Sequence, residues 1–582
     1  MIRRLIQSIK EYKRETIKTP VFVALEAVME IIIPLLMADL IDYGIDAGEI
    51  HVVVKYGAAL LIATLMELFV GSLAGRSAAI ASSGFARNLR RDMYYNVQEF
   101  SFSNIDKFST SSIVTRLTTD VTNVQQAFQM IIRMAFRAPL MIVFALIVSF
   151  RIHAGISLVF LACIPVLGTG LFLIMRKAHP IFERVFRTYD RLNNVVQENL
   201  RGIRVVKSFI REDHEKKKFS DISGDICTDF ISAEKTLAFN MPLMQLCMYS
   251  CMLLISWFGA RVLVSSGGTE LTTGQLMSLL TYATQILMSL MLLSMVFVMI
   301  TMSRASAQRI AEILEEKSDL SSPAGPVVLY QVPNGEIRFD HVDFSYSQNM
   351  DRLCLKDISL TIRSGETIGI IGGTGSSKSS LVQLIPRLYD ATRGTVSVGG
   401  ADVRQYDLDT LRNAVAMVLQ KNVLFSGTIK ENLRWGSEHA TDEELIHACQ
   451  LAQADGFIQS FPDGYDTYIE QGGTNVSGGQ KQRLCIARAL LKKPKILILD
   501  DSTSAVDTKT DAMIRKAMAE EIPDTTKIII AQRVASVQDA DQIIVMEHGC
   551  ISAIGKHEEL LQSSSIYREV YESQSKGSDS DE

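Results

Sequence analysis

The sequence predicts an all-α membrane domain with six spanning helices, followed by an α/β domain. Three observations predict this division. The chain has 582 residues, more than one domain usually contains, and its apolar residues (47%) are concentrated in the first half. No charged residue occurs between Glu270 and Arg304, a stretch long enough to cross a bilayer. After about residue 335, short β-rich runs alternate with helical segments, which is typical of an α/β domain.

Charge-poor segments recur through the first half of the chain. Clear runs lie between Arg151 and Arg176 and between Lys235 and Arg261, and three weaker ones precede them. The predicted spans lie near residues 20–38, 57–75, 134–150, 156–175, 241–263 and 275–301, within a membrane domain covering 19–305. The connections at 76–133 and 176–240 are long and helical in pattern, so we expect spans 2 to 5 to extend beyond the bilayer.

Basic residues indicate the orientation of the spans. Six Lys and Arg residues precede the first span, whereas the loop after it is acidic. The positive-inside bias therefore predicts a cytoplasmic N-terminus, and six crossings return the C-terminus to the same side. Residues 1–18 carry apolar residues at helical spacing among basic ones, which favours an amphipathic helix at the bilayer interface over a short solvated helix.

Three acidic residues, Glu26, Glu30 and Glu67, interrupt the first two spans. Intramembrane acids are costly and usually face a cavity or a partner. Two interpretations are open: a polar contact with a transported cation, or a structural role, which is either an ion pair with Arg133 or Arg137 or placement near the cytoplasmic boundary.

Charge and cysteine content exclude several classes of protein. The net charge of −5 gives no case for nucleic-acid binding. The eight cysteines are scattered without CxxC pairs, so neither a disulfide framework nor a cysteine metal site is predicted.

A phosphate-binding loop follows the first strong strand of the second half. The segment ETIGIIGGTGSSKSSLVQLI reads as strand, glycine-rich turn and helix. Backbone amides at such a helix start cradle phosphates, while Lys378 would reach the β- and γ-phosphates and Ser379 would hold Mg²⁺. Ser377 stands where the strict GxxxxGK[ST] pattern has glycine, and a ligand-free Gly/Ser turn is the alternative. The predicted contact residues are Gly372, Gly373, Thr374, Gly375, Ser376, Ser377, Lys378, Ser379 and Ser380.

A second anion-binding helix start lies in TNVSGGQKQRLCIARALLKKPKILILDD. Ser477, Gly478, Gly479 and Gln480 open this helix with bare amides. The helix leads to a buried strand that ends in Asp500 and Asp501. Two phosphate-binding helix ends are redundant for one nucleotide, but they make sense if one serves a nucleotide held by a partner domain.

The motif order resembles that of ATP-binding cassette transporters. It comprises GGTGSSKS, Gln420 in VLQKNVLFSGTIKENL, VSGGQ, ILILDD and SAVD, and six preceding spans are similar to an exporter half-transporter. The resemblance implies ATP and Mg²⁺ as cofactors. It implies that Tyr346 stacks on adenine, that Gln420 contacts Mg²⁺, and that Asp500 holds Mg²⁺ through water. It also implies that Ser504, Ala505, Val506 and Asp507 face a partner cassette.

The resemblance extends to the domain organisation. Residues 335–572 form the expected nucleotide-binding domain after a linker at 306–334, and an acidic tail at 573–582 is predicted to be disordered. Segments near 103–115 and 206–216 match the family's coupling helices. The implied location is the cell membrane, as a multi-pass protein with both termini in the cytoplasm.

Two positions depart from the family's catalytic pattern. Asp501 stands where an active cassette has glutamate, and Gln532 stands where it has the switch histidine. Aspartate is shorter by one C–C bond, about 1.5 Å, and a misplacement of about 1 Å can cost about a hundredfold in rate. Glutamine carries no proton or positive charge as histidine can. These departures predict a site that binds ATP and hydrolyses it poorly.

The expected protein is the degenerate subunit of a heterodimeric multidrug exporter. Its signature residues would complete a competent ATP site on a second half-transporter, and hydrophobic or amphipathic compounds would leave the cytoplasm. Two alternatives remain: a homodimeric lipid or peptide exporter, and an ATP-binding membrane regulator or gate.

Overall fold

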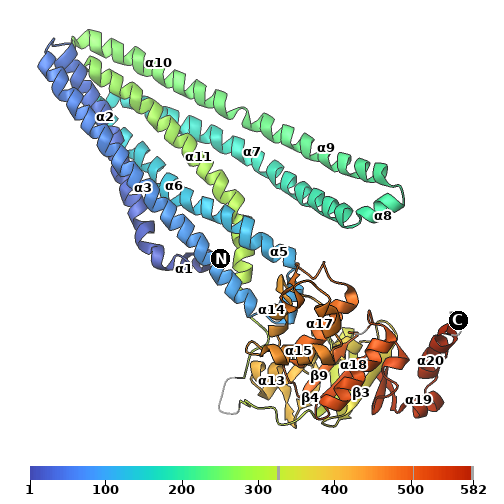
Figure 1. The fold of residues 1–582 in the computed structure, drawn as a ribbon. Coiled ribbons are helices and arrows are strands. Elements are labelled where there is room, and N and C mark those ends of the chain that lie inside the picture. Colours follow the sequence, from blue (N-terminus) through green and yellow to red (C-terminus); the bar gives the residue numbers. More distant parts are fainter. Residues whose placement is uncertain (324–327, 503, 579–582) are drawn as a thin grey trace. The chain divides into compact units, whose positions relative to one another are not determined.

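The computed structural model describes residues 1–323, 328–502 and 504–578, which divide into two compact units. The first unit contains residues 1–98 and 109–316 and consists of helices. The second contains residues 99–108 and 317–582 and is built around β-sheets (Figure 1). The short segment 99–108 thus belongs by its contacts to the second unit, although it lies in sequence between two helices of the first.

Six helical stretches of the first unit are long and apolar enough to cross a membrane. They are Lys10–Ile45, Ile50–Gln98, Thr110–Ile152, Ala154–Arg201, Glu212–Ser266 and Thr273–Glu315. Their helices are α2 (Lys13–Leu40), the π-helical turn η2 (Ile41–Ile45), α3 (Ile50–Gln98), α5 (Thr110–Thr115), the π-helical turn η3 (Arg116–Asp120), α6 (Val121–Ile152), α7 (Ala154–Arg201), α8 (Ile203–Ser208), α9 (Glu212–Leu237), α10 (Asn240–Ser266) and α11 (Thr273–Glu315).

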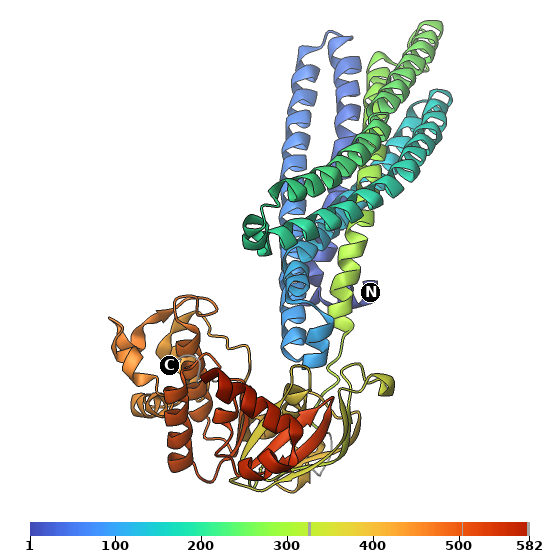
Figure 2. The ribbon, with the colours of Figure 1, turned by 90° about the vertical axis from the view of Figure 1, so that its right-hand side faces the viewer.

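Local chemistry accounts for where two of these helices start. His153 adopts an extended backbone after α6, and its Nδ1 accepts a hydrogen bond from the Ile156 amide at 3.2 Å, which caps α7. Thr272 and Gln275 form a reciprocal capping box at the start of α11. Figure 2 shows α7 and α9 running side by side with α8 joining their ends, as expected for long helical extensions of the spans.

Proline and buried hydroxyls join α11 to α2. Pro34 lies inside α2 and lacks an amide hydrogen, so the Glu30 carbonyl loses its helical partner. The Gln285 amide of α11 donates to that carbonyl at 3.4 Å. Tyr282, fully buried, donates its hydroxyl to the Ile31 carbonyl at 2.7 Å, and Ser278 donates to the Pro34 carbonyl at 2.6 Å. The two helices are therefore held by polar contacts as well as by apolar packing.

The acids of the first span are paired with a cation. Arg137 of α6 bonds Glu30 at 2.7 Å and lies 3.6 Å from Glu26, which is buried. Glu67 has no hydrogen bond or ion pair within the described part of the chain. Of the two interpretations left open by the sequence, the structure shows the ion pair for Glu26 and Glu30. Glu26 Oε2 is nevertheless buried without a hydrogen bond.

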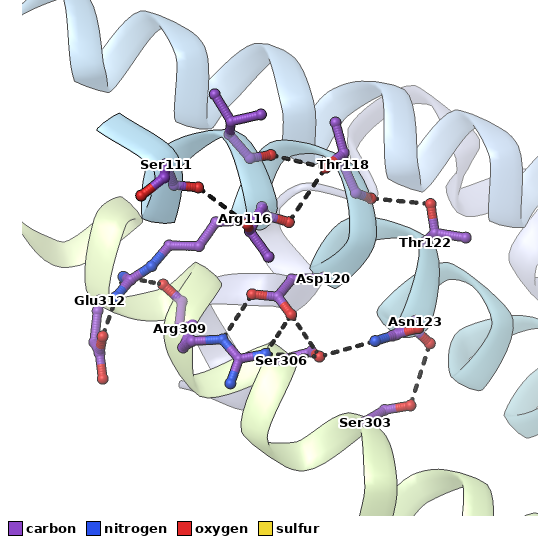
Figure 3. Close-up of polar contacts among 12 residues, drawn as sticks. Ser111, Arg116, Thr118, Asp120, Thr122, Asn123, Ser303, Ser306, Arg309 and Glu312 are labelled. Atoms are coloured by element: carbon purple, nitrogen blue, oxygen red, sulfur yellow. Dashed lines mark hydrogen bonds and ion pairs between the residues drawn. The ribbon is translucent and has the colours of Figure 1, made fainter. Parts of the chain in front are cut away.

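A second polar network joins the start of α6 to the end of α11 (Figure 3). Asp120, which is 1% exposed, accepts hydrogen bonds from Ser306 Oγ at 2.8 Å and from Arg309 Nε at 2.7 Å. Arg116 donates to the Arg309 carbonyl at 2.7 Å. Asn123 donates to Ser306 Oγ at 3.2 Å. The π-helical turn η3 lies here, and such turns recur at functional positions in helices.

The N-terminal segment is not one continuous helix. Residues 1–18 divide into α1 (Ile2–Gln7), a 3₁₀ turn η1 (Lys10–Tyr12) and the first residues of α2. The break coincides with Lys10, whose φ is +43°. Leu5 and Ile9 are buried, and the Lys10 amine pairs with Asp92 of α3 at 2.6 Å. Contacts within the first unit therefore determine the shape of this segment.

The described residues of the second unit form three sheets. A six-stranded sheet has the order β12-β11-β3-β10-β9-β6, a four-stranded antiparallel sheet has the order β2-β1-β4-β5, and β7 pairs with β8. The strands are β1 (Ile337–Phe344), β2 (Leu355–Ile362), β3 (Thr367–Gly372), β4 (Arg393–Val398), β5 (Ala401–Asp402), β6 (Val415–Val418), β7 (Gly427–Thr428), β8 (Tyr468–Ile469), β9 (Ile496–Asp500), β10 (Thr526–Ile530), β11 (Gln542–Glu547) and β12 (Cys550–Gly555).

Helices complete the second unit. They are α4 (Phe102–Lys107), α12 (Lys378–Gln383), α13 (Leu408–Ala414), α14 (Ile429–Arg434), α15 (Asp442–Leu451), α16 (Asp455–Gln459), α17 (Gly478–Leu490), α18 (Thr508–Glu521), α19 (His557–Ser563) and α20 (Ser565–Ser578). Single 3₁₀ turns occur at Met350–Arg352, Val403–Gln405, Gly464–Asp466 and Val534–Ser536.

The parallel strands are buried on both faces, as their continuous apolar sequence predicts. In β9, Ile496 and Ile498 pack into a core shared with the antiparallel sheet, while Leu497 and Leu499 pack into a core shared with α17 and α18. Because this strand is enclosed, its first solvent-accessible side chains are those that follow its carboxyl end.

Residues 573–578, the first part of the tail predicted to be disordered, lie in α20, which continues to Ser578. Gln574 accounts for this extension. Its side chain donates to the Gln532 carbonyl at 2.8 Å and accepts from the Val534 amide at 2.9 Å. Residues 579–582 lie outside the described residues.

Candidate nucleotide site

Four of the predicted site residues lie at one edge of the six-stranded sheet. Strands β3, β10, β9 and β6 run parallel, so their carboxyl ends lie at the same edge. Gly372 ends β3, Asp500 ends β9, and Gln532 and Gln420 follow β10 and β6 within two residues. Ligands of open α/β sheets bind at such an edge.

The phosphate loop, residues 373–377, connects β3 to α12. Lys378 Nζ donates to the carbonyls of Gly372 at 2.8 Å and Gly373 at 2.9 Å, and lies 3.3 Å from Ser376 Oγ. Burial lowers the pKa of Lys378, and the carboxylates of Asp500 and Asp501 oppose that shift. The amine is thus held inside the loop, where a phosphate group would meet it.

Ser377 adopts a left-handed backbone with φ +69° and ψ +25°. Glycine enters this conformation without a steric penalty, whereas a residue with a Cβ pays about 1–2 kcal/mol. The departure noted in the sequence therefore falls on a position whose conformation favours glycine. Gly375 in the same loop also has positive φ, +82°.

Ser379 and Asp500 come together as a pair of oxygen ligands. Ser379 Oγ donates to Asp500 Oδ1 at 3.0 Å, and Asp500 is buried. Burial raises the pKa of Asp500, and the Ser379 hydrogen bond opposes the rise. A hydroxyl beside a carboxylate suits Mg²⁺, which prefers oxygen ligands and few protein groups when phosphates supply the rest.

Asp501 and Gln532, the two departures from the family pattern, contact each other. Gln532 Nε2 donates to Asp501 Oδ2 at 2.9 Å, and Gln420 Nε2 donates to the same oxygen at 3.4 Å. Asp501 has φ +50°, and its amide donates to the Ile530 carbonyl at 3.0 Å. Both glutamine amides are therefore directed at the aspartate.

Tyr346 lies beside the phosphate-loop helix. Its hydroxyl is within 2.9 Å of Ser380 Oγ and donates to Gln383 Oε1 at 3.3 Å. The residue is 45% exposed, which leaves aromatic surface accessible to a base. Burial of its other side raises its pKa.

The signature residues form the N-terminal end of α17. Ser477 Oγ accepts from the Gln480 amide at 3.3 Å, and Gln480 Oε1 accepts from the Ser477 amide at 2.9 Å, which is a capping box. The Gly478 and Gly479 amides remain at the helix end, where anions bind. No described hydrogen bond joins these residues to the phosphate loop of the same chain.

Residues 504–507 pack against the signature helix. Gln482 of α17, which is buried, accepts from the Ala505 amide at 3.0 Å and donates to Ser504 Oγ at 3.3 Å. Val506 is buried, and Asp507 caps α18 through the Thr510 amide. A Cβ at Gly479 would lie 2.8 Å from the Ala505 carbonyl, so glycine permits this close packing.

Two further residues of the site were not predicted. Gln482 positions residues 504–505, and Gln574 holds the backbone of Gln532 from α20. A polar residue on the apolar side of the signature helix was a signal for Gln482. No local pattern identified Gln574, because its contact spans 42 residues of sequence.

Fold and site together define an ABC exporter half-transporter, with a membrane domain joined to an ATPase-type domain. Comparison with known families supports this class. Residues 17–290 match the ABC transporter transmembrane region, and residues 355–504 match the ABC transporter domain. The chain belongs to the ABC transporter family.

The chain is similar to several proteins over nearly the whole length of both chains. The ABC transporter ATP-binding protein YfiB of Bacillus subtilis is 38% identical, and the similarity covers 94% of each chain. A Staphylococcus aureus relative, whose name proposes a multidrug export ATP-binding/permease protein, is 30% identical over 98% of this chain and 99% of its own. A bacterial Atm1-family ABC exporter structure with ATP bound has a TM-score of 0.83 at 24% identity, covering 97% and 99% of the two chains, and shows the same fold.

Proposed function

We propose that this chain is the degenerate subunit of a heterodimeric exporter for hydrophobic or amphipathic compounds. The contact between Asp501 and Gln532 carries the proposal. In a competent site the corresponding glutamate and histidine act on the attacking water and the γ-phosphate. Here the glutamine amide is directed at the aspartate, and the aspartate is shorter than glutamate.

The rest of the site supports nucleotide binding without efficient hydrolysis. Lys378 lies inside the phosphate loop, and Ser379 and Asp500 supply oxygen ligands that fit Mg²⁺. Tyr346 exposes a ring face for adenine. ATP binds here and is hydrolysed slowly, and this occupied site keeps two cassettes in contact through several transport cycles.

The signature supports the partner arrangement. Half-transporters of this family work as dimers in the membrane. Ser477 and Gln480 cap α17 in the reciprocal manner that leaves the Gly478 and Gly479 amides for an anion. These residues complete the ATP site of the second half-transporter, and residues 504–507, held by Gln482, face that partner. Hydrolysis at the partner's site resets the transporter.

The tip formed by α8 and the residues after it supports coupling between subunits. Phe209 and Ile210 are 74% and 84% exposed, so the tip presents apolar surface. On the second unit, a groove is lined by Leu419, Val423 and Trp435 among others. As one of the two segments that match the family's coupling helices, this tip takes part in converting cassette closure into opening of the membrane cavity toward the outside.

The transporter is multi-pass in the cell membrane with both termini in the cytoplasm. The basic residues before α2 and the acidic loop after it support this orientation. The name of the Staphylococcus aureus relative supports a multidrug substrate class.

Restoring the catalytic pair tests the proposal. The chain is purified with its partner half-transporter, sought first in the neighbouring reading frame. Asp501→Glu and Gln532→His introduced together should raise ATPase activity above that of the wild-type complex, with nucleotide binding retained. An unchanged rate with normal binding would contradict a degenerate site.

Two measurements separate the alternatives. Vigorous ATP turnover by the purified chain alone would favour a homodimeric lipid or peptide exporter. Failure of vesicles containing the assembled complex to take up dye would favour an ATP-binding regulator or gate.

A further inference from the structure

A chain of aromatic contacts leads from Tyr346 to α4 within the second unit. The rings of Tyr346 and Tyr389 lie 5.1 Å apart between centroids at an interplanar angle of 89°. Phe344 contacts both rings, at 4.9 Å and 5.7 Å. Edge-to-face contacts at these distances have a preferred geometry, so the orientation of one ring restricts the next.

Tyr389 also contacts α4. Its hydroxyl donates to Asp106 Oδ2 at 2.7 Å, and its ring lies 6.1 Å from that of Phe102. Tyr389 itself is buried, whereas Asp106 is exposed. A hydrogen bond to a carboxylate is stronger and more directional than one between neutral groups.

The other described contacts of α4 lead elsewhere. Ser101 and Ser103 donate to the Asp319 carboxylate, and Asn104 donates to the Lys317 carbonyl at 3.1 Å. These bonds attach the segment 99–108 to the start of the linker. Tyr389, in contrast, contacts both α4 and the tyrosine expected to meet adenine.

The segment that contains α4 is covalently joined to two membrane-crossing stretches. Residues 99–108 join α3 to α5, and both of those helices belong to membrane-crossing stretches. A change in the position of α4 must therefore be accommodated by the ends of two of these stretches.

We propose that Tyr389 is a positioning residue that transmits adenine binding at Tyr346 to α4 through its hydrogen bond with Asp106. This inference rests on the proposed nucleotide site and adds the path by which the base is sensed. Stacking of adenine on Tyr346 restricts the Tyr346 ring, which restricts Tyr389 by edge contact and stabilises one position of Asp106. A nucleotide can shift the equilibrium between two positions of α4 only if it stabilises the contacts of one position more than those of the other.

The chain provides a matched control. Tyr465 donates its hydroxyl to Asp455 Oδ1, also at 2.7 Å, and is buried to a similar degree in the same unit. Tyr465→Phe removes an equivalent Tyr–Asp hydrogen bond that is not part of the Tyr346 ring contacts. Tyr389→Phe and Asp106→Asn remove the two ends of the proposed link.

Hydrogen–deuterium exchange of residues 99–108 in the assembled transporter tests the link without requiring transport. ATP should slow exchange of this segment about fivefold in the wild type and in Tyr465→Phe. UTP, whose pyrimidine stacks less, should slow it less. In Tyr389→Phe and Asp106→Asn the response to ATP should fall to that of UTP, while ATP affinity changes by less than about twofold, and the double variant should match the single ones.

An undiminished ATP response in Tyr389→Phe would overturn the inference, as would an equal loss in Tyr465→Phe. Dye uptake by the same preparations is measured separately. Loss of uptake in the wild type would refute the proposed export function while leaving the exchange result to decide the role of Tyr389.

Discussion

The network between α6 and α11 provides a quantitative test of how the first unit is held together. Asp120 is 1% exposed, and both of its oxygens accept hydrogen bonds from Arg309, with a further one from Ser306. Arg309→Met keeps most of the side-chain volume but removes the cation. The Asp120 carboxylate would then stay buried with the Ser306 hydroxyl as its remaining side-chain partner among those shown in Figure 3.

The expected cost follows from the burial of the two partners. Removing one partner of a fully buried ion pair destabilises a protein by about 3–5 kcal/mol. The Arg309 side chain is 44% exposed, so solvent already screens the pair and water can replace part of the lost interaction. We therefore expect a loss of about 2 kcal/mol, below the range for a fully buried pair.

Asp120→Asn combined with Arg309→Met removes the uncompensated charge and keeps an oxygen for Ser306. The double variant should be more stable than Arg309→Met alone, with a coupling energy of about 1–2 kcal/mol. The matched control is Arg191→Met, because Arg191 pairs with Asp225 at 3.5 Å while both side chains are more than 60% exposed. Exposed pairs of this kind contribute about 0–1 kcal/mol.

The assay is thermal unfolding of the purified transporter at one protein and detergent concentration. The expected order of unfolding temperature is wild type, then Arg191→Met close to it, then the double variant, then Arg309→Met. If Arg309→Met unfolds no earlier than Arg191→Met, the buried network does not stabilise the contact between α6 and α11. With Asp120→Asn measured alone as well, a double variant that equals the sum of the two single changes would show that the two side chains do not interact as the structure shows.

Other predictions concern both units. Ser377→Gly should relieve about 1 kcal/mol of left-handed backbone cost and stabilise the second unit against thermal unfolding by a similar amount. Because burial raises the pKa of Asp500, Mg²⁺-dependent ATP affinity should fall as pH is lowered through that pKa, and Asp500→Asn should abolish both the Mg²⁺ dependence and its pH dependence. Gln574→Ala should speed amide exchange at Val534, because it removes the side-chain acceptor of that amide. The free energy of unfolding should change by no more than about 1 kcal/mol, as measured by thermal unfolding. Arg137→Gln should reduce the yield of folded protein by leaving two acids in the bilayer uncompensated, and Arg137→Lys should restore part of it.

Local patterns predicted the spans and the phosphate loop, whereas the proposed roles of Tyr346, Gln420 and residues 504–507 came from the family resemblance. The spans follow from uncharged stretches, and the phosphate loop, signature and paired aspartates each lie within a few residues of sequence. Parallel strands then bring distant motifs together without further information, because their carboxyl ends share an edge. Asp501 and Gln532 were singled out by the family resemblance, and the shared edge places them in contact at 2.9 Å.

Contacts between distant segments could not be predicted in the same way. Hydropathy placed Glu26 and Glu30 in the first span but did not distinguish a cation contact from a pair with Arg137, because that choice depends on how α2 packs against α6. The helical end of α20 depends on hydrogen bonds from Gln574 to a segment 40 residues away. Disorder was predicted there from polar composition, and composition carries no information about hydrogen bonds to distant residues such as Gln532 and Val534.

The same reasoning explains why Asp501 is informative. A buried strand delivers two acids to the sheet edge, and Asp500 turns inward to the Ser379 hydroxyl. Asp501, in a left-handed conformation, faces the side-chain amides of Gln420 and Gln532. Changing Asp501 alone to glutamate would lengthen the acid but leave it facing an amide that cannot accept a proton. Under the proposed function we therefore expect efficient hydrolysis only when both positions change together, and a single Asp501→Glu substitution should give less ATPase activity than the pair. Equal activity of the single and double variants would show that Gln532 does not limit the site.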